Sequence, residues 1–445
     1  MTLPGTERAV ALAVSGKLWS TCAGLLTTLL VASFFAADIQ GYYYTFLSIL
    51  ALQVLAELGL GVVITAYSSH EWARLAFDRK GGIRGDADAF SRLCGLGRFA
   101  LRWYLAAGVI VMLALGLGGL LFFGSTGWSQ VSVWGGPWAA LCIVTGINVC
   151  LLPFWAILEG CNQVANVYAY RLVQAIAVSA VTWLGIWAGA GLWVAPLIGA
   201  AAALASVATI GWHYAGFFRT VMFGRPTGPR LAWRADILPM QWRVAVSWLA
   251  GYLAFSLFTP VLFHYQGPVV AGRMGMTWAF IGALTGIATS WIAPKAPSFG
   301  ILIAQGRFAE LDRMFWRLTT VVVGVTAAGA LAIWTLIYGL GRWGHPLAER
   351  LLAPADAACF LVATVLVAAS LPMSTYLRAH KKEPLLVLSV VSGIVTGLTV
   401  VLAGQHYSAR GVAIGYLAAT AVITPFVALI WHLKRSEWHP RRAPA

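Results

Sequence analysis

GYYYTFLSILALQVLAELGLGVVITAYSSHEWAR, residues 41–74, is an apolar run long enough to cross a bilayer, yet it carries a carboxylate, Glu57, in its inner half. An acidic side chain at the centre of a membrane helix costs about 2.5 to 3.5 kcal/mol on insertion scales, so it normally faces protein or a water-filled cavity. We therefore expect Glu57 to be a proton or cation site. The alternative is a carboxylate that packs against a neighbouring helix for structure alone.

The composition of the whole chain is that of a polytopic membrane protein. Of its 445 residues, 60% are hydrophobic and only 10% are charged, and the mean hydropathy is +0.79. These values exclude an ordinary soluble globular protein. The net charge of +15 does not indicate nucleic acid as a partner, because the basic residues lie in the breaks between apolar runs, where they set the topology.

Runs of about 20 apolar residues predict twelve transmembrane helices, so the expected fold class is all-α. Their approximate limits are 12–36, 42–67, 101–123, 137–158, 169–189, 192–216, 242–264, 270–292, 318–340, 355–377, 385–403 and 411–432. With the N-terminus inside, 26 of the 30 lysines and arginines fall on the cytoplasmic side, which predicts that both termini are cytoplasmic. The residues left on the outer face are Arg273, Arg342, Arg350 and Arg410.

The two halves of the chain follow the same plan. In each half the longest inner loop follows the second helix, and the fourth helix carries a proline, Pro153 or Pro372, near its inner end. This rhythm predicts two six-helix bundles, 1–220 and 241–445, joined by a cytoplasmic linker at 221–240. The alternative is that twelve helices with short loops show such a rhythm by chance.

The two longest inner loops, 68–98 and 294–317, are polar and basic but are interrupted by apolar residues. We expect both to lie as amphipathic segments on the inner membrane surface, held by anionic lipid.

Four further ionisable residues are candidates for substrate binding. Glu159 and Arg171 flank the inner turn between the fourth and fifth helices, where Arg171 is placed to meet an anionic headgroup; an interfacial ion pair is the alternative. Arg273 lies on the outer side without an acid nearby in sequence, and it either grips phosphate oxygens or extends to the membrane surface. His264 ends the seventh helix and is either an interfacial residue or a proton relay.

No motif for catalysis is present. The six cysteines form no CxxC pair and no metal-ligand spacing with histidine, and the chain contains neither GxxxxGK[ST] nor HExxH. The sequence therefore predicts a protein that is not an enzyme, with no metal and no cofactor.

The chain resembles the multidrug/oligosaccharidyl-lipid/polysaccharide (MOP) exporter superfamily, and within it the polysaccharide-biosynthesis flippases of the O-antigen type. The resemblance covers the whole chain through its twelve-helix plan. The motifs that carry it are GYYYTF at 41–46, ELGL at 57–60 followed by ITAYSSHEWA, LEGCNQV at 158–164 and GPVVAGRMGMTWA at 267–279.

This resemblance implies a V-shaped pair of bundles around a central cavity that opens to each side of the membrane in turn. It implies transport of an undecaprenyl-diphosphate-linked oligosaccharide, the repeat unit of a lipopolysaccharide or exopolysaccharide, from the inner to the outer leaflet of the bacterial cytoplasmic membrane. Glu57, Arg171 and Arg273 map to the cavity by their positions in the second, fifth and eighth helices. Expected partners are membrane lipids, a coupling proton or sodium ion, and the polymerase and glycosyltransferases of the same pathway.

Other functions remain open at this point. A cation-coupled multidrug exporter of the same superfamily would use Asp38 or Glu57 for ion entry. A membrane glycosyltransferase or polymerase needs a substantial outer loop, and the predicted outer loops are too short. A scaffold of an envelope assembly complex would have the same helices without transport.

Overall fold

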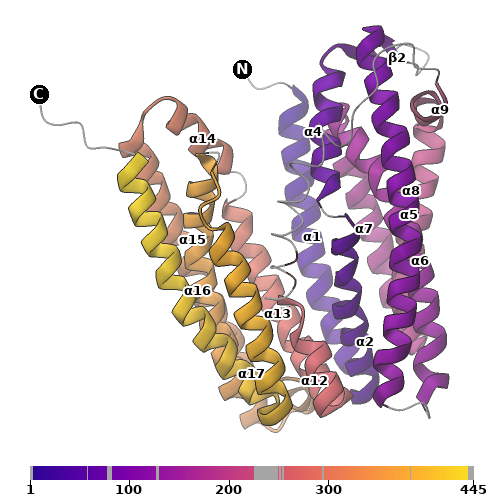
Figure 1. Ribbon diagram of the computed structural model, residues 1–445. Coiled ribbons are helices and arrows are strands. Elements are labelled where there is room, and N and C mark those ends of the chain that lie inside the picture. Colours follow the sequence, from indigo (N-terminus) through magenta and orange to yellow (C-terminus); the bar gives the residue numbers. More distant parts are fainter. Residues whose placement is uncertain are drawn as a thin grey trace, which may run out of the picture. The chain divides into compact units, whose positions relative to one another are not determined.

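A computed structural model of the chain describes residues 4–57, 59–77, 83–126, 130–224, 249, 252, 255–292, 295–380 and 382–438. These residues are almost entirely helical (Figure 1), as the sequence predicts. The chain packs as two compact units. Unit 1 contains residues 1–23 and 46–249, and unit 2 contains residues 24–45 and 250–445.

Two helices contribute to both units. The boundary between the units falls inside α1 (Pro4–Phe34), between Ala23 and Gly24. It falls again inside α2 (Ala37–Leu50), between Thr45 and Phe46. Residues 24–45 thus pack with the second half of the chain, although they belong to the predicted 1–220 bundle. The division into 1–220, 221–240 and 241–445 stays a prediction, because most of the predicted linker lies outside the described residues.

Unit 1 is a helical bundle with one small β-hairpin. After α2 its elements are the 3-10 helix η1 (Ala51–Gln53), α3 (Val54–Glu57), α4 (Leu60–Trp72), β1 (Leu75–Phe77), β2 (Ile83–Gly85), α5 (Ala87–Thr126), α6 (Val131–Gly160), α7 (Val164–Trp187), the 3-10 helix η3 (Gly191–Trp193), α8 (Val194–His213) and α9 (Ala215–Phe223). Helices α5 and α6 approach closely at two glycines: a Cβ on Gly108 would lie 2.7 Å from the carbonyl oxygen of Gly146. Small residues allow such close packing where lipid supplies no hydrophobic driving force.

The predicted second span, 42–67, is not one helix. Helix α2 ends at Leu50, and the chain passes through η1 and α3 before α4 begins at Leu60. Gly59, just before α4, has a φ of 69°, a left-handed conformation that a right-handed helix does not contain. The two glycines of the run, Gly59 and Gly61, permit close helix approach or a local opening of the backbone, but the apolar composition alone predicts one span.

The loop predicted at 68–98 is largely ordered secondary structure. Helix α5 begins at Ala87, and the strands pair antiparallel with Leu75 opposite Gly85. The apolar residues of the hairpin pack against protein: the ring of Phe77 lies 4.7 Å from that of Trp72 and 5.4 Å from that of Phe217. The ring of Phe77 thus contacts both α4 and α9, and the prediction that anionic lipid holds this segment stays a prediction.

Unit 2 is also helical. Its elements after residue 250 are α12 (Phe258–Gln266), α13 (Pro268–Ile292), α14 (Ala296–Ala304), α15 (Phe308–Arg342), the 3-10 helix η5 (Pro346–Arg350), α16 (Pro354–Ala379) and α17 (Leu386–Trp438). Helix α17 has 53 residues, about 80 Å if straight, which exceeds twice the roughly 30 Å of a bilayer core. It bends at Ser408, where φ is 57°, and its two arms correspond to the last two predicted spans.

Residues from the start of α2 are locked into unit 2 by close contacts. A Cβ on Gly41 would lie 1.9 Å from the carbonyl oxygen of Pro268, so only glycine fits there. A Cβ on Gly275 would lie 2.3 Å from Cβ of Tyr44, and the rings of Tyr42 and Phe263 are 4.9 Å apart. Gly41 and Gly272 also lie against each other, because a Cβ on Gly272 would be 3.0 Å from the backbone nitrogen of Gly41.

Eight of the described helical segments are long and apolar enough to cross a membrane: 11–34, 87–125, 131–160, 164–187, 191–213, 308–342, 354–379 and 386–438. The chain is therefore a multi-pass membrane protein. About half of the segment 242–264, predicted as the seventh span, lies outside the described residues. The count of twelve spans stays a prediction.

Lysine and arginine gather at one end of each unit, here called its basic end. In unit 2 the side chains at the basic end are Lys295, Arg307, Arg313, Arg317, Arg378, Lys382, Lys434 and Arg435, and those at the opposite end are Arg273, Arg342, Arg350 and Arg410. Both α14 and the C-terminal end of α17 lie at the basic end (Figure 1).

Candidate functional sites

Glu57 lies at the break between α3 and α4. It is the last residue of α3, its side chain is half-buried, and Gly59 turns the chain two residues later. The carbonyl end of a helix carries partial negative charge, so a carboxylate at this position favours a bound cation. Interrupted helices within a membrane protein are tolerated where they line a polar site or are enclosed by protein.

Tyr104 of α5 lies against the helix that follows Glu57. Its hydroxyl is 3.7 Å from where a Cβ on Gly61, four residues after Glu57, would be. The hydroxyl oxygen is buried and has no hydrogen-bond partner among the residues that the structure describes. A buried hydroxyl without a partner is costly, so it marks a place where a ligand oxygen or water can bind. Tyr104 is not predictable as a site residue from the sequence, because no spacing relates it to Glu57.

Glu159 and Arg171 are brought together at the basic end of unit 1. Their Oε1 and Nη2 atoms are 2.6 Å apart, and the Arg171 guanidinium lies 5.6 Å from the ring of Tyr168. The side chain of Arg171 is 45% exposed and that of Glu159 is 22% exposed. The ion pair that the sequence left as the alternative is thus present.

Glu159 also lines a polar pocket of about 590 Å³. The pocket lies between the end of α4, strand β1 and the turn from α6 to α7. Its polar lining residues are Ser69, Glu159, Asn162 and Gln163, and the side chain of Gln163 is oriented by a 2.8 Å hydrogen bond from Asn166. This pocket is a candidate for a sugar or headgroup, and its one carboxylate is already paired with a cation.

Arg273 is held at the opposite end of unit 2. Its Nε donates to the backbone oxygen of Glu349 at 2.8 Å. Beside it, buried Gln40 donates to the backbone oxygens of Gly272 at 2.9 Å and Arg350 at 3.2 Å. In the described part of unit 2 no carboxylate pairs with Arg273 or Arg350. The Arg350 guanidinium makes a longer contact, from its Nη1 to Gln40 Oε1 at 3.5 Å, so both arginines meet neutral oxygens that leave their charge uncancelled.

Gln40 and Arg350 were not singled out from the sequence. Gln40 sits in an amphipathic-looking turn before GYYYTF, and nothing in its spacing indicates that it joins α2, α13 and η5. His264 is exposed and stacks edge-on with Tyr265, with ring centroids 4.8 Å apart. Among the described residues no three histidine, cysteine or acidic side chains gather closely enough to hold a metal ion.

The predicted site residues therefore form separate local groups. Glu159 and Arg171 pair with each other, Glu57 lies at the break before α4, and Arg273 is fixed by η5. Within unit 1, as far as it is described, no ion pair joins Glu57 to Arg171. Their roles in a substrate site stay predictions.

Comparisons with known proteins agree on the fold. No protein-family model matches the chain, and no curated protein sequence matches it. Among solved structures, the chain is similar to a multidrug resistance MATE family transporter of the MOP superfamily in an inward-facing conformation, with a TM-score of 0.69, 14% identity and coverage of 98% of this chain and 100% of that one.

Two further structures extend the comparison. Lipid II flippase MurJ in an inward closed conformation gives a TM-score of 0.62 at 12% identity, over 96% of this chain and 90% of that one. A MOP superfamily transporter from Pyrococcus furiosus, described as having a binding pocket of reverse polarity, gives a TM-score of 0.58 at 16% identity, over 98% of this chain and 96% of that one. The chain thus has the MATE/MOP transporter fold along its whole length.

Proposed function

We propose that this protein is a MOP-superfamily transporter that moves a lipid-diphosphate-linked oligosaccharide from the cytoplasmic to the outer leaflet, exposing its substrate site to each side in turn. The full-length fold similarity to MATE transporters and to a lipid II flippase supports the transporter part of the proposal. The preference for an anionic lipid comes from the charge of the candidate sites.

The observation that carries the choice of substrate is the arginine pair Arg273 and Arg350. Both are positioned by neutral oxygens and neither meets a carboxylate in the described part of unit 2. Arginine grips phosphate oxygens through two parallel hydrogen bonds, and its charge is worth more near hydrocarbon than in water. A diphosphate lipid needs such counter-charge because its headgroup cannot cross the apolar core unaided.

Glu57 takes the role of coupling-ion site in this proposal. A proton or sodium ion bound at the break between α3 and α4 would stabilise the carboxylate and the carbonyl end of α3 together. The unpartnered hydroxyl of Tyr104 supplies a further oxygen. Cation-coupled drug export is the second candidate, and this same acidic site is the observation that favours it.

The test is transport of a fluorescent undecaprenyl-diphosphate oligosaccharide in proteoliposomes that contain the full chain. We expect Arg273→Ala to lower the transport rate per folded molecule about tenfold, because a bidentate charge-assisted contact is lost. Arg342→Ala, an outer arginine at the end of α15, is the matched control and should transport as the unchanged protein does. Equal rates for the two variants would remove Arg273 from the site.

A further inference from the structure

The basic end of unit 2 contains a pocket of about 660 Å³ between α14 and α15. Each helix contributes one continuous face to it. The lining residues of α14 are Ser298, Ile301, Leu302 and Gln305, those of α15 are Glu310, Arg313, Met314, Arg317, Leu318 and Val321, and Trp291, Lys295 and Arg307 complete the wall. In both helices these positions are three or four residues apart, so the pocket follows from two helix faces turned toward each other.

The pocket is a fixed feature of the fold, because α14 is held by a hydrophobic core. Phe299 and Leu302 of α14 are buried in one cluster with Phe315 of α15 and Trp431 of α17. The rings of Phe315 and Trp431 stack with centroids 4.6 Å apart. The predicted amphipathic segment 294–317 is thus α14 and the first turns of α15, and one face of it packs on protein.

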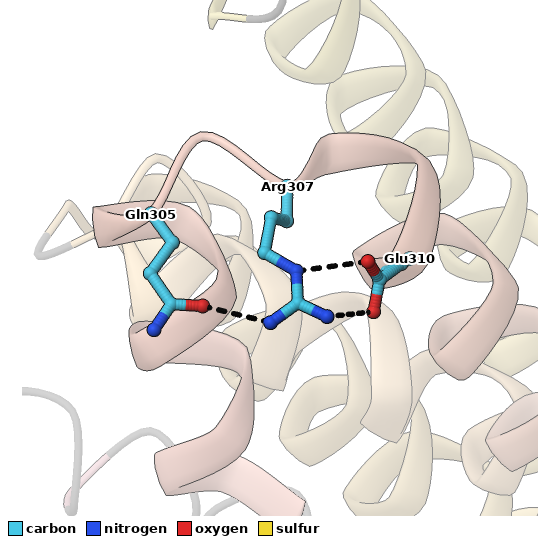
Figure 2. A network of polar contacts seen from close by, with 3 residues as sticks. All are labelled: Gln305, Arg307 and Glu310. Carbon is cyan, nitrogen blue, oxygen red and sulfur yellow. Dashed lines mark hydrogen bonds and ion pairs between the residues drawn. The ribbon is translucent and has the colours of Figure 1, made fainter.

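One basic side chain of the pocket is already satisfied. Figure 2 shows the Arg307 guanidinium between two acceptors: its Nε and Nη2 donate to the carboxylate of Glu310 at 2.8 and 2.5 Å, and its Nη1 donates to Gln305 Oε1 at 3.1 Å. These bonds tie the end of α14 to the first turn of α15. Arg307 therefore shapes the pocket and has little charge left for a ligand.

The other three cations of the pocket, Lys295, Arg313 and Arg317, have no acidic partner among the described residues. The nearest acid in sequence, Asp312, points away from them and accepts two hydrogen bonds from Arg435, at 3.0 and 2.5 Å. Three positive charges therefore face one pocket whose only carboxylate is paired with Arg307.

Apolar side chains also line the pocket. Leu302 and Leu318 are buried at the pocket, while Trp291 and Ile301 are about half exposed beside it. Tryptophan at a membrane boundary prefers the headgroup level, and lysine and arginine there attract anionic headgroups. A ligand that matches this wall carries a phosphate for the cations and a hydrocarbon chain for the apolar side.

We propose that this basic pocket binds the phosphate of a membrane lipid. The two arginines contact phosphate oxygens, Lys295 adds a point charge, and the acyl or isoprenoid chain lies against Trp291 and Ile301. The proposal goes beyond the transport function, since it holds whether the lipid is the cargo or a phospholipid of the surrounding leaflet. A volume of about 660 Å³ is within the range of small-molecule sites.

The test is native mass spectrometry of the full chain in detergent, titrated with phosphatidylglycerol and, separately, with zwitterionic phosphatidylcholine. Arg313→Gln with Arg317→Gln should weaken phosphatidylglycerol binding at least tenfold. Phosphatidylcholine binding should fall far less, because the choline ammonium already offsets the charge of that lipid's phosphate. The control is Arg342→Gln, an exposed arginine at the far end of the same helix, which should bind both lipids normally. Equal phosphatidylglycerol affinity in the double variant and the control would overturn the proposal. If the double variant does not fold, Lys295→Gln replaces it in the test, and we expect its phosphatidylglycerol affinity to fall about threefold.

Competition distinguishes the possible sources of the phosphate. Stronger displacement of bound phosphatidylglycerol by undecaprenyl phosphate assigns the pocket to the transported class of lipid, whereas weaker displacement assigns it to bilayer phospholipid; both outcomes uphold lipid-phosphate binding. Displacement by free pyrophosphate as effective as by either lipid would overturn it, because the apolar wall would then contribute nothing. Loss of binding with intact transport would separate this pocket from the proposed cargo site.

Discussion

The basic ends of the two units carry pockets of similar volume but different charge balance. In unit 1 the pocket of about 590 Å³ has one carboxylate, Glu159, which is paired with Arg171. In unit 2 the pocket of about 660 Å³ keeps Lys295, Arg313 and Arg317 without acidic partners. We therefore expect the position of the acidic residues, and not the number of basic residues at a membrane face, to decide which pocket binds an anion.

One acid of unit 2, Asp312, is used between helices. Asp312 at the start of α15 accepts hydrogen bonds from Tyr376 of α16 and Arg435 of α17, which joins three helices at their basic ends. Because this pairing satisfies the acid, the neighbouring arginines on the pocket face of α15 stay available. The pairing of Asp312 with Arg435 thus leaves the positive charge of Arg313 and Arg317 free to bind an anion.

The largest effect that we expect comes from breaking this pairing with Asp312→Asn. The change leaves Arg435, which is only 32% exposed, without its carboxylate, and we expect a loss of about 2 kcal/mol in the free energy of unfolding. Thermal unfolding in detergent measures it. The exposed pair Arg378–Glu383 provides the control: Glu383→Gln should cost less than about 0.5 kcal/mol. Equal losses would show that Asp312 has no special structural role.

A second variant makes the unit 2 pocket resemble that of unit 1. Met314→Glu places a carboxylate on the pocket face of α15, one turn from Arg317 and beside Arg313. We expect phosphatidylglycerol affinity to fall about tenfold, because the added acid neutralises the free cations. Met314→Gln changes the shape equally without the charge and should keep most of the affinity. If both variants bind alike, charge balance does not explain the difference between the units.

The converse change in unit 1 has the smallest expected effect. Glu159→Gln removes the partner of Arg171, so we expect the polar pocket to gain anionic lipid binding by about threefold, consistent with the modest strength of half-exposed ion pairs. Binding of phosphatidylglycerol by native mass spectrometry measures the gain. Arg171→Gln, which removes the cation instead, should give no gain, and a gain in both variants would contradict the idea that Arg171 is the responsible group.

The sequence predicted the features that depend on hydrophobic run length and residue type. The helical fold follows from its apolar runs, and the fold similarity along the whole chain agrees with the resemblance carried by GYYYTF and LEGCNQV. The ion pair of Glu159 and Arg171 was foreseen as an alternative, because both residues flank one turn.

Features that depend on contacts distant in sequence were not predictable. Nothing near Gly41 indicates that it packs on Pro268, and nothing in the run 42–67 fixes a left-handed Gly59 rather than a continuous helix. Likewise, the loop around Lys295 and Arg317 reads as a generic basic segment. Its pocket becomes visible only when Asp312 is seen to pair with Arg435 on another helix.

The central claim, a cargo that is an anionic lipid, is tested most directly by offering both candidate cargoes to the same proteoliposomes. Vesicles containing the full chain, a fluorescent undecaprenyl-diphosphate oligosaccharide and a cationic dye would be followed for movement of each across the bilayer. We predict that the lipid changes leaflet and that the dye neither moves nor competes. Dye movement driven by a proton or sodium gradient, with the lipid remaining in its leaflet, would contradict the account.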